Sequence, residues 1–167
     1  MVENKILKEN GGIISLSILR IIIAFMLIWS FFDKLLGLGL ETPSGSGMID
    51  GGSPSSFILY FDGPVAELMY GLAENIVVDI VLMAALILIG LALLTGVGMK
   101  IATASGIAFF FIMYLVCLFP GDNPFLDYHL VYIFVLLAIY FYHAGDFLGF
   151  GKRWKELNIV KKYNILE

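Results

Sequence analysis

The most prominent feature of the sequence is a series of long apolar stretches separated by polar segments. Each is close to the roughly 20 residues that a helix needs to cross the hydrocarbon core of a bilayer. Because backbone polar groups in lipid must be bonded within their own segment, we expect each stretch to be a helix. The pattern predicts an all-α integral membrane protein, a bundle of four transmembrane helices at residues 13–36, 76–94, 101–119 and 125–144.

The connection between the first two spans, residues 37–75, is unusually long. It opens with a stretch rich in Gly, Ser and Pro, ETPSGSGMIDGGSPSS, which predicts a flexible loop. Two apolar segments follow, FILYF and GPVAELMYGLAEN, and Pro64 stands where a helix would begin. Both are too short to cross a bilayer. We expect two short interfacial helices, which form either a packing cap over the bundle or a lid over a cavity.

Lys and Arg are distributed unevenly among the connections. The connection 37–75 has neither residue and carries five acids, and residues 120–127 are acidic too. The tail 147–167 has five basic residues, and the tail 1–12 has two. Basic segments stay on the cytoplasmic side. The chain is therefore expected to be a multi-pass plasma-membrane protein, with a membrane domain at 13–146, both tails cytoplasmic and the acidic connections outside.

The composition supports a membrane protein and excludes several function classes. Of the 167 residues, 60% are hydrophobic and 14% charged, whereas a soluble domain is about half apolar. The net charge of -4 offers no basic face for nucleic acid. Cys117 is the single cysteine, so an internal disulfide and a CxxC couple are excluded. No metal-ligand spacing, phosphate loop, dinucleotide fingerprint or nucleophile elbow is present, so no cofactor or metal is encoded by a motif.

A small set of ionisable residues lies within or at the ends of the predicted spans. Charges at membrane depth cost several kcal/mol, so they usually face the bundle interior or a cavity. This property marks the following residues as candidates: Arg20, Asp33, Lys34, Asp79, Asp127, His129 and His143. The two histidines lie about 21 Å apart along one helix, so they cannot share a haem within one chain.

Lys34 is the most informative of these residues, because it is a base on the side where every connection is acidic. Asp33 points about 100° away on the helix, so each of the two needs its own partner. For Lys34 the candidates are Asp127, Asp79 or an anionic ligand. We expect Lys34 to face Asp127 or His129, and Asp33 to face solvent or a loop.

The ionisable groups at the outer ends of three helices predict a polar pocket beneath the long outer connection. Lys34, Asp127 and His129 are its candidate catalytic residues, although a lone histidine at a helix entry is more often an interfacial residue. Asp79 and Asp33 are assigned to substrate binding or to a structural polar role. Arg20 joins that group, and for it snorkelling or a structural salt bridge outweighs catalysis.

Three segments, in order, resemble DoxX-like membrane proteins, and especially the DoxD-type small subunit of thiosulfate:quinone oxidoreductase. They are LRIIIAFMLIWSFFDKLLGLGLETPSGSGMIDGGSPSSF, LILIGLALLTGVGMKIATASG and NPFLDYHLVYIFVLLAIYFYHAGDFLGFGKRW. The resemblance implies a redox-associated four-helix membrane protein whose sulfur-oxidation activity requires a second subunit. The family motif positions that fall here are Lys34, Gly90, Gly96, Asp127, His129 and Gly145.

Three functions follow as hypotheses. The first is a quinone-linked redox membrane subunit of the thiosulfate:quinone oxidoreductase type, with quinone as a substrate and a second redox subunit as partner. The second is a non-enzymatic membrane scaffold for a redox or thiol-handling partner. The third is a small-solute transporter, which would need a homo-oligomer and lacks the paired interrupted helices of secondary transporters. All three hypotheses allow a homo-oligomer, and in all three the lipid bilayer is a partner.

Overall fold

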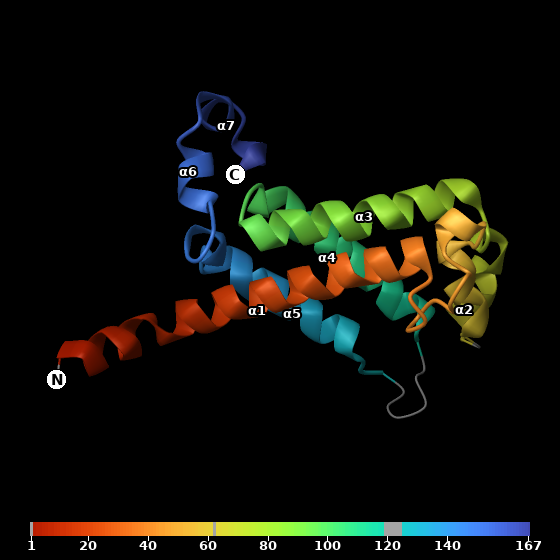
Figure 1. Cartoon of the computed structure of the whole chain (residues 1–167). Coiled ribbons are helices and arrows are strands. Elements are labelled where there is room, and N and C mark those ends of the chain that lie inside the picture. Colours follow the sequence, from red (N-terminus) through yellow and green to blue (C-terminus); the bar gives the residue numbers. More distant parts are fainter. Residues whose placement is uncertain (1, 62, 119–124) are drawn as a thin grey trace.

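The computed structural model describes residues 2–61, 63–118 and 125–167, and within these residues the chain is helical with no strand. In the part of the chain that the structure describes, three helices are long and apolar enough to cross a membrane: Asn10–Leu36, Ile76–Thr95 and Met99–Val116. The fourth apolar helix, Tyr128–Phe141, has 14 residues. Figure 1 shows these four helices packed along one another, with the short helices of the long connection at one end and the C-terminal helices at the other.

Helix α1 (Val2–Leu36) starts well before the predicted span. The expected N-terminal tail is thus largely a continuation of the helix, and Figure 1 shows that end projecting from the bundle. Helix α3 (Ile76–Thr95) lies alongside α1. Gly90 permits this close approach, because a Cβ there would lie 2.7 Å from the Cγ1 of Ile28.

Helices α3 and α4 (Met99–Val116) form a hairpin whose turn is set by glycine. Gly96 ends α3 in the left-handed conformation, with φ at +74°, and it packs against the backbone of Gly145. This contact brings the turn after α3 against the backbone at Gly145. Residue 119, the predicted end of the third span, and residues 120–124 of the third connection lie outside the described residues.

Helix α5 (Tyr128–Phe141) is shorter than its predicted span for reasons visible at both ends. Asp127 caps its start by accepting hydrogen bonds from the backbone N–H groups of His129 and Leu130. At the other end His143 takes a positive φ of 52°, which the helix cannot continue through. The apolar sequence there therefore extends beyond the helix itself.

The long connection is helical where the sequence is apolar. After the short turn η1 (Met48–Asp50), the first four residues of FILYF end the 3-10 helix η2 (Pro54–Tyr60), and Phe61 follows in extended conformation. Helix α2 (Pro64–Met69) then begins at the predicted proline and continues as η3 (Tyr70–Leu72). At one end of the bundle, η1 packs on α1, η2 on α3 and α2 on α4.

The basic C-terminal segment folds back onto the bundle. It consists of four short helices: η4 (Ala144–Asp146), α6 (Gly151–Lys155), α7 (Asn158–Lys162) and η5 (Asn164–Leu166). The Trp154 indole N–H donates to the Leu166 carbonyl, and the Lys100 backbone N–H donates to Glu167. The expected tail is therefore an ordered element against the start of α4.

Apolar side chains fill the core and also cover much of the outside. Leu93, Leu136 and Ile139 are fully buried where the helices meet. Large apolar side chains on the outer faces are exposed, among them Phe25 on α1 and Phe134 on α5. An apolar exterior of this kind is suited to lipid contact.

Candidate functional site

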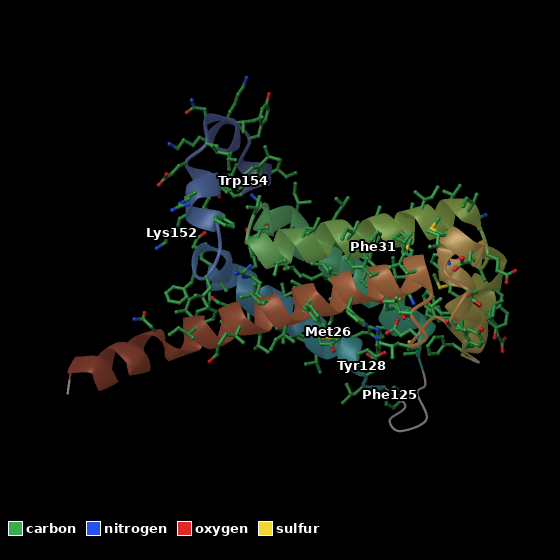
Figure 2. The ribbon with its side chains drawn as sticks, in the orientation of Figure 1. Met26, Phe31, Phe125, Tyr128, Lys152 and Trp154 are labelled. Atoms are coloured by element: carbon green, nitrogen blue, oxygen red, sulfur yellow. The ribbon has the colours of Figure 1, made fainter. Side chains whose placement is uncertain are left out.

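A cavity of about 340 Å³ lies between the helices near the end covered by the long connection. Four helices and η2 contribute to its wall. Most of the lining is apolar or aromatic: Ile23, Met26, Leu27, Phe57, Tyr60, Phe61, Leu82, Leu86, Phe109, Phe110, Met113, Tyr128 and Tyr132. The polar lining residues are Ser30, Lys34, Glu41, Cys117 and His129. Figure 2 shows Met26 and Tyr128 on the side of the bundle away from Trp154 and the C-terminal helices.

Lys34 lies in the wall of this cavity, but its carboxylate partner differs from the one expected. Its ammonium group pairs with Glu41, at an Nζ to Oε2 distance of 3.1 Å. It also lies 5.5 Å from the ring centroid of Phe57. Among the described residues, neither Asp127 nor Asp79 pairs with Lys34, whereas His129 lines the same cavity. Glu41 therefore takes the place of the carboxylate partner that was expected for Lys34, and Lys34 and His129 both line the cavity.

Asp33 explains why Glu41 reaches Lys34. Its carboxylate is 1% exposed and accepts hydrogen bonds from the backbone N–H groups of Leu40 and Thr42, at 3.4 and 2.7 Å. These two bonds fold the chain after α1 back along the helix and bring Glu41 to the cavity. Of the two alternatives for Asp33, the structure shows the loop-facing one.

Asp79 is buried at the start of α3, outside the cavity lining. It accepts hydrogen bonds from the hydroxyl of Ser53, at 2.9 Å, and from the backbone N–H of Ser55, at 2.7 Å. These bonds tie the start of η2 to α3. Asp79 thus holds the long connection in place over the bundle, which is the structural alternative considered for it.

Arg20 lies near the middle of α1, is fully buried and is not part of the cavity lining. Its guanidinium donates to the carbonyls of Leu93 and Leu94 at the end of α3 and to that of Leu148. Backbone carbonyls take the place of the expected salt bridge, and those of Leu93 and Leu94 lie at the negative end of the α3 dipole. Arg20 therefore joins α1, α3 and the C-terminal segment and takes no part in the cavity.

Asp127 and His129 form a tight pair at the start of α5. One carboxylate oxygen, Oδ1, caps the helix, and the other, Oδ2, lies 2.5 Å from the His129 Nδ1. The His129 side chain is 9% exposed and packs beside the rings of Phe110 and Tyr128. Asp127 thus fixes the orientation of the imidazole, leaving Nε2 as the ring nitrogen for other contacts. His143 lies at the far end of α5, exposed and apart from this pair.

Cys117 is the residue that sequence reasoning did not connect with this pair. It follows the end of α4, and its Sγ, an Asp127 oxygen and a His129 ring nitrogen all lie within 4.8 Å of one another. The Cys117 side chain is partly buried there. No regular spacing joins residues 117, 127 and 129, so only folding could bring them together.

Comparisons of the chain with protein-family models, with curated proteins and with solved structures found no match.

Proposed function

We propose that the chain is a four-helix subunit of the plasma membrane that binds a quinone in the cavity and takes part in quinone-linked redox chemistry. The observation that carries this proposal is the cavity itself, which is aromatic and apolar along most of its wall and polar at Lys34 and His129. A quinone has the same division, with a planar polar head and a long apolar tail. Pockets that are mostly apolar with a few convergent polar groups are typical ligand sites.

The polar groups suit the chemistry of a quinone head. Reduction of a quinone to a quinol takes two electrons and two protons, and each carbonyl oxygen accepts one proton. Lys34 is a hydrogen-bond donor in the cavity wall, and the His129 Nε2 is free of the contact that Nδ1 makes with Asp127. We assign these two residues to the carbonyl oxygens, with His129 passing protons and Asp127 orienting it.

The electrons would come from a partner subunit that oxidises a sulfur donor such as thiosulfate, as the resemblance to DoxD-type proteins implies. In the proposed orientation both termini are cytoplasmic and the cavity lies toward the outer face. A dianionic donor is repelled by the acidic outer connections, so we place its oxidation on the partner and the quinone on this chain.

Quinone binding by matched variants tests the proposal. The full chain in lipid nanodiscs would be titrated with a short-tailed quinone, and bound quinone would be measured after separation from free ligand. His129→Asn keeps a donor near the Nδ1 position for Asp127 but removes Nε2, while His143→Asn is its control, because asparagine also tolerates the positive φ there.

We expect His129→Asn and Lys34→Met to weaken binding about tenfold or more, since each removes a hydrogen bond in a largely buried site. His143→Asn and Lys152→Met should bind as the unaltered chain does. Absence of saturable binding by the unaltered chain, or equal affinity in all four variants, would refute a quinone site in this cavity.

The scaffold function is the second candidate, and one observation favours it. Leu68 on α2 is 85% exposed, and Leu72 on η3 is also exposed, so the short outer helices present apolar side chains that a partner could cover. A scaffold would keep its partner and the complex activity in Lys34→Met and His129→Asn. It would lose the partner in Leu68→Asp, and this opposite pattern separates the two functions.

A further inference from the structure

We propose that Cys117, Asp127 and His129 form a binding site for a thiophilic divalent metal ion of the zinc class. The sequence offers no spacing that indicates such a site, and the proposal rests on the three side chains brought together by α4 and α5. Thiolate sulfur, imidazole nitrogen and carboxylate oxygen are the three donor types that zinc binds in proteins. Calcium and magnesium prefer all-oxygen sites, so they do not fit this donor set.

The distances fit a metal with only a small rearrangement. With metal–ligand bonds of about 2.0 to 2.3 Å, two ligand atoms of a tetrahedral site lie about 3.5 Å apart. The three donor atoms already lie within 4.8 Å of one another. The Asp127 Oδ2 and His129 Nδ1, now 2.5 Å apart, would open by about 1 Å as the metal takes the place of the proton between them.

The site is held in shape by the helix ends around it. The Asp127 Oδ1 accepts from the backbone N–H groups of His129 and Leu130, so the carboxylate is fixed before any metal arrives. The Asp127 and His129 side chains are 6% and 9% exposed. Ligands fixed by other contacts lose less entropy on binding a metal, which favours a site of this kind.

The same three residue types also occur in catalytic triads, but the geometry argues against that use. In a triad the acid and the nucleophile lie on opposite sides of the imidazole, which separates them. Here the Cys117 Sγ lies within 4.8 Å of the Asp127 carboxylate. A metal would bind Cys117 as the thiolate, and the thiol proton would leave to solvent.

Three protein ligands leave one position of a tetrahedral metal open. Cys117 and His129 both line the cavity, so this position would face its interior. A carbonyl oxygen of a bound ligand could occupy it, and this consequence rests on the proposed quinone function. Metal binding itself does not depend on that function and can be measured without any quinone.

The test is a cobalt titration of the full chain in detergent after removal of metals with a chelator. Cobalt bound to a thiolate gives a near-ultraviolet charge-transfer band, so the signal reports Cys117 directly. We expect one cobalt per chain, displacement by zinc, and protection of Cys117 from alkylation in the zinc-loaded protein.

Three variants, Cys117→Ser, Asp127→Asn and His129→Asn, distinguish this three-ligand site from adventitious binding of the metal to a lone thiol. Asparagine remains a good helix cap at position 127, so Asp127→Asn removes a ligand and keeps the start of α5. Cys117→Ser should abolish the band, and the other two should weaken binding at least tenfold, with Asp50→Asn and His143→Asn as unaffected controls.

No charge-transfer band in the unaltered chain would overturn the proposal. A band that keeps the same affinity in Asp127→Asn and His129→Asn would also overturn it, as adventitious binding to a lone thiol. If circular dichroism shows that any variant fails to fold, X-ray absorption spectroscopy of the zinc-loaded unaltered chain tests the proposal instead. A zinc coordination shell with one sulfur and with nitrogen and oxygen ligands supports the site, and a coordination shell without sulfur refutes it.

Discussion

Asp33 controls the chemistry of the cavity from outside it. Its side chain does not line the cavity, yet it holds the backbone at Leu40 and Thr42, and Glu41 lies between them. Glu41 in turn accepts from Lys34 and from the Ser30 hydroxyl. A buried carboxylate in α1 thereby determines which partner the lysine has.

Replacing Asp33 by asparagine should therefore affect both stability and ligand binding. The amide has one oxygen and cannot accept equally from both backbone N–H groups, so we expect a loss of about 1–3 kcal/mol in the free energy of unfolding. Glu41 should also become less fixed, which would weaken quinone binding. Chemical unfolding in detergent micelles measures the first effect, and the quinone titration measures the second.

Asp50→Asn is the matched control, because Asp50 is exposed and its change should stay within about 0.5 kcal/mol. Equal stability of the two variants would show that the bonds from Asp33 do not hold the turn.

Among the helices, the contact between α1 and α3 depends on the absence of a side chain at Gly90. A Cβ there would meet Ile28 at 2.7 Å and the carbonyl oxygen of Ala24 at 3.3 Å. Arg20 fastens the same two helices further along by donating to the end of α3. One pair of helices is thus joined by close packing at one level and by hydrogen bonds at another.

Gly90→Val should force α1 away from α3 and cost about 1–3 kcal/mol through overpacking. The control is Gly12→Val, since a Cβ on Gly12 meets nothing within 4 Å. Both changes place the same residue inside a helix, so the difference in thermal unfolding isolates packing from helix propensity. A Gly90→Val chain as stable as Gly12→Val would contradict the close contact.

On the scale of the whole molecule, the proposed orientation places the long connection outside and the C-terminal helices in the cytoplasm. The asymmetry of Lys and Arg supports this, and the ordered C-terminal segment keeps its basic residues at one end of the bundle.

Single cysteines in a Cys117→Ser background test this orientation with a membrane-impermeant maleimide. Ser44→Cys should be labelled in intact cells, and Glu156→Cys only after the membrane is permeabilised. Both positions are exposed, so access to the reagent and not burial decides the result. Labelling at Glu156→Cys in intact cells would reverse the assignment.

Several elements were predictable because each depends on local chemistry. Apolar runs gave the four main helices, and Pro64 gave the start of α2. The helix ends were harder to place, since Asp127 acts as a cap and His143 takes a positive φ only in the folded chain. The partner of Lys34 was missed because Glu41 reaches it through a turn held by a buried carboxylate.

By itself the sequence determined the helical architecture, the apolar exterior and the ionisable residues worth following. These properties depend on residue type and on spacing along one helix, where 3.6 residues make a turn. Only the tertiary structure decided which of those residues meet. It placed Arg20 on backbone carbonyls and Asp79 on the long connection, and it gathered Cys117 with Asp127 and His129. The physical reason is that contacts between helices depend on how the helices pack and how the connections fold, and neither is encoded in the spacing of residues along one segment.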